Sequence, residues 1–374
     1  MAIEFINLKK QYDLLRKDID RAIKNVLSHG KYILGPEVKE FESDLSNFLN
    51  VKHAITCANG TDALLLALMA LDVKNKDAIF IPSFTFASTA EVIPYTNATP
   101  FFVDCDPDTF NMDITSLERT INFSRRQGFE PSVIIPVDLF GLAADYKNIK
   151  ELANRENIRI IGDSAQGFGS KIHGKYSSEF CDIVTTSFFP AKPLGCYGDG
   201  GAIFTNDNNL ADDLLSLRFH GKGKHKYENV RIGMNSRLDS IQAAVLIQKL
   251  KIFSKEILQR QEIAKTYNDN LSDIIKTPKI DSCYESVWAQ YSLLAIDSNE
   301  REKIMEMLAR KNIPSNIYYP VPLHLQKAYK EYPLDPEGLK NSEDIAEKIF
   351  SLPMHPYLTD QEQNSIISVI REYF

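Results

Sequence analysis

The sequence predicts an α/β protein with a mostly parallel sheet between helices, followed by a smaller α+β C-terminal domain. In the first two thirds of the chain, short continuously apolar runs alternate with stretches of helical periodicity. Such runs are typical of parallel strands that are buried on both faces. The length of 374 residues suits two domains, and we expect a large domain at residues 1–250 and a small one at 251–374.

Two helices are expected before the sheet, as part of the large domain. Between Gln11 and Leu27 apolar side chains recur at helical spacing, and Gly30 follows as a stop signal. A second amphipathic stretch begins after Pro36, a residue favoured in the first turn of a helix.

The strands of the sheet are expected where the apolar runs are short and uninterrupted. These runs are residues 53–58, 78–82, 100–104, 133–137, 159–162, 183–187 and 202–205. A long helix over residues 238–257 is the expected bridge to the small domain. That domain should contain a strand near 290–295, a helix at 300–311 and a terminal helix from Asp360.

The bulk composition narrows the class of protein. Apolar residues make up 44% and charged residues 25%, as in globular domains, and the net charge of −7 argues against a nucleic-acid-binding surface. Neither a signal peptide nor a bilayer-spanning run is visible, so no membrane association is expected. The five cysteines are scattered without a Cys-x-x-Cys pair and the histidines lack metal spacing, which indicates a cytoplasmic protein without a metal site.

Lys192 and Asp163 are the most informative residues. Lys192 lies between Pro190 and Pro193 in a glycine-rich turn between two apolar strands, and Asp163 ends an earlier strand. A lysine in apolar surroundings has a lowered pKa and is a good nucleophile, and an acid beyond a parallel strand lies where such sheets bind ligands. This pair is what a pyridoxal phosphate (PLP) enzyme needs; the alternatives are a surface lysine and a helix-capping aspartate.

Three further segments have both a functional and a structural interpretation. Gly60 and Thr61 open a helix after a strand, where backbone N–H groups bind phosphate, and Ser187 could hold a phosphate oxygen. Alone, the glycine turn is better explained by a capped helix. Phe86 could stack on a flat cofactor, or it could simply pack in the core.

A basic stretch precedes the long helix. It contains Arg218, His220, Lys222, Lys224, His225 and Lys226. The stretch is either a solvated loop or a flexible loop that meets an anionic substrate. Asn235 and Arg237 follow at the start of the helix, where they could also serve an anion.

Taken together, these motifs resemble the DegT/DnrJ/EryC1/StrS family of nucleotide-sugar aminotransferases. The matching segments are residues 32–37 (Tyr-Ile-Leu-Gly-Pro-Glu), 58–64, 104–107, 163–166 (Asp-Ser-Ala-Gln), 187–201 and 235–239. The resemblance covers almost the whole chain and implies the aspartate aminotransferase-like (type I PLP) fold. Residues 187–201 and 351–357 look most like the enzymes that aminate C3 of UDP-2-acetamido-2-deoxy-3-keto-glucuronic acid for bacterial surface polysaccharide, including lipopolysaccharide O-antigen.

The resemblance also implies roles for the cofactor-binding residues. Lys192 would bind PLP as a Schiff base, Asp163 would pair with the pyridine nitrogen, and Gln166 would contact the ring hydroxyl. Phe86 would stack on the ring. The residues implied at the phosphate are Gly60, Thr61, Ser187 and, from the neighbouring subunit, Asn235, which would make a homodimer obligatory.

For the substrate, Arg237 would bind a uronic carboxylate, and His220, Tyr318 and Tyr319 would line the sugar site. Two residues depart from the family pattern. Gly162 stands where a glutamate is usual before the aspartate. Tyr318 stands where the related C3 enzymes have histidine, which leaves the identity of the sugar open.

The implied reaction moves an amino group from L-glutamate to the keto sugar and leaves 2-oxoglutarate, with Lys192 as covalent anchor and general acid/base. Three alternatives remain open at this point. They are the same chemistry on another C3 or C4 keto sugar with a UDP, dTDP or GDP carrier, a different PLP reaction such as dehydration, and a non-catalytic nucleotide-binding regulator.

Overall fold

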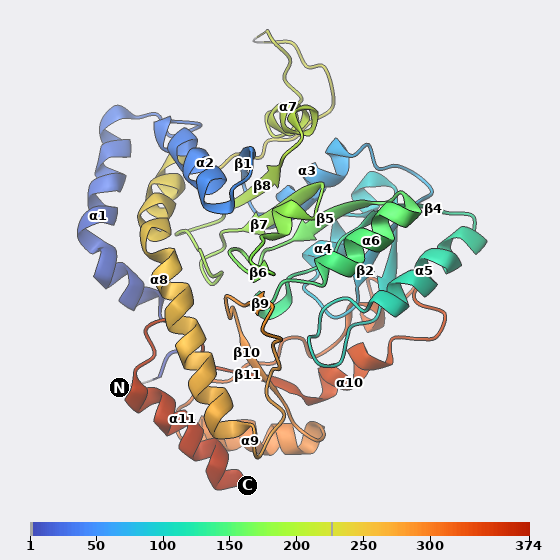
Figure 1. Cartoon of the computed structure of the whole chain (residues 1–374). Helices are drawn as coiled ribbons and strands as arrows, with labels where there is room; N and C mark the ends of the chain where they lie inside the picture. Colours follow the sequence, from blue (N-terminus) through green and yellow to red (C-terminus); the bar gives the residue numbers. More distant parts are fainter. Residues whose placement is uncertain (1–2, 226) are drawn as a thin grey trace.

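The computed structural model describes residues 3–225 and 227–374 and is built around one large sheet (Figure 1). The sheet has seven strands in the order β1-β8-β7-β5-β4-β2-β3. Only β8 is antiparallel to its neighbours, β1 and β7; the other pairs are parallel. The expected mostly parallel sheet is therefore confirmed.

The strands lie close to the expected positions. Their bounds are β1 (His53–Cys57), β2 (Asp77–Pro82), β3 (Thr99–Val103), β4 (Glu130–Ile134), β5 (Arg159–Asp163), β7 (Ile183–Ser187) and β8 (Gly201–Thr205). β4 is displaced toward the N-terminus from the expected 133–137. Pro136 has no N–H to donate, and Val137 makes only an isolated bridge to Asp163.

Helices cover both faces of the sheet, which explains why its strands are apolar throughout. On one face Ile161, Ile183 and Ile203 pack against α3 (Gly60–Ala70) and α7 (Asn208–Leu217). The other face is covered by α2 (Pro36–Leu49), α5 (Ile114–Arg126), α6 (Tyr146–Glu156) and α8 (Ser240–Leu271). Successive strand residues point to opposite faces, so both sets must be apolar.

The two N-terminal helices form where local signals place them. α1 (Leu8–His29) begins at Asn7, whose side chain accepts from the Lys10 N–H at 2.9 Å. It ends at Gly30, which has φ 68°, a left-handed conformation that favours glycine. α2 begins with Pro36 at its first turn. Both helices pack against α8 (Figure 1).

α8 is longer than the sequence predicts and continues beyond the expected end at residue 257 to Leu271. The apolar pattern resumes at Ile263, Tyr267 and Leu271, but the buried polar side chains of Glu256 and Arg260 interrupt it. Because α8 crosses residue 250, the expected domain division at that residue remains a prediction.

The C-terminal region forms its own hydrophobic cluster below the large sheet (Figure 1). It contains the antiparallel pair β10 (Tyr291–Leu294) and β11 (Ile349–Leu352) with α9 (Ser298–Arg310), α10 (Lys340–Lys348) and α11 (Asp360–Tyr373). Two short strands, β6 (Lys171–Ile172) and β9 (Tyr284–Glu285), link the two regions. Among residues 3–225 and 227–374, no helix combines the length and apolar character that a membrane crossing requires.

Candidate active site

Lys192 lies in a tightly folded turn between β7 and β8. The Lys192 N–H donates to the Phe189 carbonyl at 2.8 Å. A Cβ at Gly195 would lie 2.4 Å from the Pro190 carbonyl oxygen, so only glycine permits this backbone path. Burial lowers the pKa of the Lys192 amine, and the nearby Asp163 carboxylate opposes that shift. The turn therefore holds an amine that is easily deprotonated.

A second lysine, which the sequence did not single out, secures this turn. Lys249 of α8 is only 1% exposed, and its Nζ donates to the Gly195 carbonyl at 2.6 Å. The amine also lies 4.3 Å from the centre of the Tyr197 ring. Burial lowers the pKa of Lys249 to about 8. Because its apolar neighbours in α8 mark a core face, the buried charge was not evident from the helical pattern.

Asp163 ends β5, the strand beside β7, and its carboxylate is buried. It accepts hydrogen bonds from the Thr89 hydroxyl at 2.9 Å and the Ala165 N–H at 3.1 Å. Burial raises the pKa of Asp163, while those two donors and the charge of Lys192 oppose the shift. Thr89, on the short helix α4 (Ser88–Glu91), is a partner that the sequence analysis did not identify.

Gln166, Tyr319 and Phe86 surround the space near Asp163. The Gln166 side chain accepts from the Phe140 N–H at 3.0 Å and donates to the Tyr319 hydroxyl at 3.1 Å. The Phe86 ring is 54% exposed, with its centre 6.4 Å from that of Tyr319. Phe86 is therefore not core packing, the alternative that the sequence had left open.

The start of α3 faces the end of β7. The Asn59 side chain caps α3 by accepting from the Asp62 N–H at 2.7 Å, and the first N–H groups of a helix have no acceptor within it. A Cβ at Gly60 would lie 2.7 Å from the Ser187 Cβ, so the two segments touch. The Thr61 hydroxyl is 2.8 Å from that of Ser88. Gly60, Thr61 and Ser187 thus meet at one end of the sheet.

These residues fit the cofactor that the sequence implies. Asp163 is a buried carboxylate with no ion pair within the described residues, and a protonated ring nitrogen would supply the missing positive charge. The exposed face of Phe86 suits a flat ring, and the free N–H groups at the start of α3 suit a phosphate. The amine of Lys192, in the same place, suits an aldehyde.

The segment between α7 and α8 forms a loop that projects beyond α7 (Figure 1). His220, Asn235 and Arg237 belong to this segment, and Ser236, between the last two, accepts from the Ala58 N–H at 3.0 Å. Asn235 is exposed and bridges Phe219, and the Arg237 guanidinium stacks 4.9 Å from the Phe219 ring. The His220 carbonyl accepts from the Asn229 side chain at 2.8 Å.

The basic stretch is not uniformly available to a ligand. Arg218 is buried, donates to the Thr56 carbonyl at 2.7 Å and pairs with Glu42 at 2.5 Å, so its role is structural and the interpretation of Arg218 as part of a substrate loop was wrong. Lys226 lies outside the described residues. The remaining members are in the projecting loop.

The glycine at position 162 has a structural cause. A Cβ there would lie 2.9 Å from the Tyr146 hydroxyl and 3.0 Å from the Cys181 Sγ. Tyr146, fully buried, fills the space that a side chain at 162 would need. The other departure, Tyr318, is part-exposed next to Tyr319, and its hydroxyl accepts from the Asn316 side chain at 3.4 Å.

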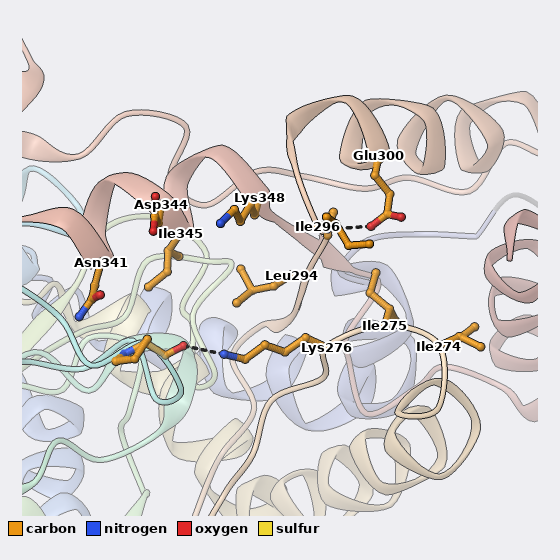
Figure 2. Close-up of a pocket in the computed structure, with 12 residues that line it drawn as sticks. Ile274, Ile275, Lys276, Leu294, Ile296, Glu300, Asn341, Asp344, Ile345 and Lys348 are labelled. Carbon is orange, nitrogen blue, oxygen red and sulfur yellow. Dashed lines mark hydrogen bonds between the residues drawn. The ribbon is translucent and has the colours of Figure 1, made fainter.

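A separate hollow lies between the loop after β3 and the C-terminal region (Figure 2). It has about 830 Å³ of space, part of it open to solvent, and no residue of the Lys192 site is among those that line it. Lys276 donates to the Pro107 carbonyl at 3.1 Å, and the Ile296 N–H donates to Glu300 at 2.7 Å. These local contacts leave no convergent set of buried polar groups among its described lining residues.

Comparisons with known proteins agree with this geometry. Residues 13–371 match the DegT/DnrJ/EryC1/StrS aminotransferase family. The chain is 43% identical over 357 residues to the UDP-2-acetamido-2-deoxy-3-oxo-D-glucuronate aminotransferase of Pseudomonas aeruginosa, covering 95% of this chain and 96% of that protein.

Two solved structures extend the comparison. A DegT DnrJ EryC1 StrS aminotransferase from Brucella abortus superposes with a TM-score of 0.97 at 50% identity, covering 99% of both chains. NtdA from Bacillus subtilis with bound cofactor PMP gives 0.87 at 28% identity, covering 96% of this chain and 81% of that one. This chain therefore belongs to the DegT/DnrJ/EryC1/StrS family of PLP-dependent aminotransferases.

Proposed function

We propose that the protein moves the amino group of L-glutamate to C3 of a UDP-linked 2-acetamido-2-deoxy-3-oxo-glucuronic acid. The observation that carries the chemistry is the turn that holds Lys192 beside the buried Asp163. The similarity to the Pseudomonas aeruginosa enzyme over nearly the full length of both chains supports the choice of sugar. A product of this kind suits the synthesis of bacterial surface polysaccharide in the cytoplasm.

Bound PLP would supply an aldehyde carbon that exchanges amino groups and a ring that accepts electrons. Lys192 would hold it covalently, and Phe86 would cover its ring. Gly60, Thr61 and Ser187 would bind its phosphate, because the start of α3 offers unpaired N–H groups and a favourable helix dipole.

Lys192 would also move the protons of both half-reactions. Its lowered pKa favours the neutral amine, which can remove the proton from the α-carbon of the donor. In the second half-reaction the protonated amine of Lys192 gives a proton back on the acceptor side. The same side chain is thus base and acid in turn, as a reversible transfer requires.

Asp163 would keep the ring nitrogen protonated. Its carboxylate is fixed by the Thr89 hydroxyl and the Ala165 N–H, so it does not need to reorient when charge develops. Gln166, held by the Phe140 N–H and the Tyr319 hydroxyl, would contact the ring hydroxyl from the same side.

The sugar acid would be recognised by Arg237, whose guanidinium matches a carboxylate in two-point fashion, with His220, Tyr318 and Tyr319 around it. In one chain, Arg237 and Asn235 belong to the segment that forms the projecting loop. We therefore propose a homodimer in which Asn235 reaches the phosphate site of the neighbouring subunit. Ile232, 88% exposed in that loop, is an apolar residue that a partner would cover.

The test is product analysis with the purified protein, PLP, L-glutamate and the UDP-linked 3-keto sugar acid. Mass spectrometry should show the keto oxygen replaced by an amine, and NMR should place the amine at C3. Amination of dTDP- or GDP-linked keto sugars in preference to the UDP substrate would overturn the choice of sugar. Absence of turnover with every keto sugar would overturn the activity.

A further inference from the structure

A narrow pocket adjoins Lys192 on the side of the N-terminal segment and α8. Its lining includes Asn7, Lys192, Arg260, His355 and Tyr357. It has about 420 Å³ of space, part of it open to solvent. These lining residues come from four separate segments, so the pocket is a product of the fold and not of one loop.

Arg260 is the unusual member of this pocket. It is only 7% exposed, and its Nη1 is buried without a hydrogen-bond partner in the part of the chain that the structure describes. No carboxylate of the described residues comes within ion-pair distance of its guanidinium. Burial lowers the pKa of Arg260, while Glu256 and Tyr357 oppose the shift. A buried cation without a bound anion is costly, so a ligand anion would stabilise it.

Glu256, one helical turn before Arg260, offsets part of this charge but forms no ion pair with it among the described residues. Its Oε1 accepts from the Gln11 Nε2 at 2.9 Å and from the Tyr357 hydroxyl, its Oε2 is also buried without a hydrogen-bond partner in the described part of the chain, and Glu256 is not part of the pocket lining. His355 has a pKa lowered to about 4 by burial, so it is neutral near pH 7. The positive groups that face the pocket are therefore Arg260 and Lys192.

We propose that this pocket binds a carboxylate of the amino donor through Arg260. The inference rests on the proposed aminotransferase function and assigns the donor side of its site. An amino acid must bring its amine to the place of the Lys192 amine, and its carboxylate must then find a cation nearby. A guanidinium forms two parallel hydrogen bonds to a carboxylate, and in a desolvated pocket these are strong.

The two substrates would then be recognised by different arginines. Arg260 would serve the donor within one chain, and Arg237, on the projecting loop, would serve the sugar acid. Because the two half-reactions are separable in time, each arginine can be tested in the absence of the other substrate. Arg310, which is exposed in α9 and pairs with Glu306, provides a matched control, since its replacement also removes one guanidinium.

The experiment follows the donor half-reaction of the PLP-loaded protein by its visible absorbance, with L-glutamate and no sugar. Arg260→Gln should lower kcat/KM for L-glutamate by about 100-fold, and Arg260→Lys should recover part of it. Arg310→Gln should leave the same rate within about threefold, since an exposed arginine outside the donor pocket contributes nothing there. An unchanged donor half-reaction in Arg260→Gln would overturn the proposal.

A second readout does not use catalysis. Succinate, a dicarboxylate without an amine, should raise the Tm of the cofactor-free wild-type protein and should not raise that of Arg260→Gln. If Arg260→Gln folds poorly, the double variant Glu256→Gln/Arg260→Gln removes both buried charges and keeps the test usable. Equal losses in the donor and sugar half-reactions would show a merely structural arginine and refute the proposal. If no sugar is aminated but the donor half-reaction depends on Arg260, only the proposed sugar activity fails.

Discussion

Replacing Asp163 by asparagine separates its role toward the cofactor from its role in the fold. Asparagine has nearly the same shape, and its oxygen can still accept from the Ala165 N–H. The Thr89 hydroxyl, which donates to the carboxylate at 2.9 Å, can turn and accept from the new amide. The substitution therefore removes one negative charge and little else.

The expected effect on turnover is large, whereas the expected effect on stability is small. Breaking a buried charge pair costs about 3–5 kcal/mol, which corresponds to a loss of turnover on the order of 10³-fold. Folding should not suffer, because burial raises the pKa of Asp163 and the ionised carboxylate is disfavoured in the cofactor-free protein. At neutral pH the free energy of unfolding of the variant should stay within about 1 kcal/mol of wild type, the value of one hydrogen bond.

The sign of the pH dependence provides a check. A carboxyl whose pKa is raised by folding binds more protons in the native state. Wild type should therefore gain stability relative to Asp163→Asn as pH falls from the raised pKa toward the ordinary value. Urea unfolding of both cofactor-free proteins across that range measures this, and steady-state kinetics measures turnover.

Thr89→Val is the control for the geometry. It removes one donor to the carboxylate but keeps the charge, so turnover should fall only about tenfold. The reasoning is refuted if Asp163→Asn turns over at the wild-type rate, or if it unfolds far more easily while its cofactor absorbance and rate per folded molecule are unchanged.

Three further changes test the site. Lys192→Ala should abolish turnover and the absorbance band of the bound cofactor with the circular dichroism spectrum retained; retained turnover would remove Lys192 from the mechanism. Gly60→Ala should weaken PLP binding by about 1–3 kcal/mol in a fluorescence titration, because the new Cβ would lie 2.7 Å from that of Ser187; unchanged affinity would contradict the close approach. The pKa of Lys249 is lowered to about 8, so between pH 8 and 10.5 the unfolded chain binds more protons than the native protein. Over that range the unfolding free energy of wild type should rise by up to about 3 kcal/mol relative to Lys249→Met. A pH-independent difference in urea unfolding would place the Lys249 charge in solvent.

Much of the fold was predictable because each element has a local signature. The strands are continuous apolar runs, and Gly30 marks the end of α1. The errors have equally local causes. Pro136 moves the end of β4, and buried polar residues in the second half of α8 concealed its continuation to Leu271.

In the candidate site, sequence alone identified the residues that carry the chemistry but not those that hold them. Lys192 and Asp163 are recognisable from residue type and position after a strand. Thr89 and Lys249 form hydrogen bonds to residues 74 and 54 positions away in the chain, and Arg260 shares a pocket with Lys192, 68 positions away. The sequence around each of these three residues is that of an ordinary helix. Pairings over such separations leave no periodic signal.

The sequence by itself determined that a nucleophilic lysine and an acid would stand at the carboxyl ends of parallel strands, since apolar runs and turn composition are local properties. Only the tertiary structure decided how charged these groups are and what faces them. Burial sets the pKa of Asp163, Lys192 and Lys249, and burial is a property of the packed chain. The unpaired guanidinium of Arg260 likewise exists only because four distant segments enclose it.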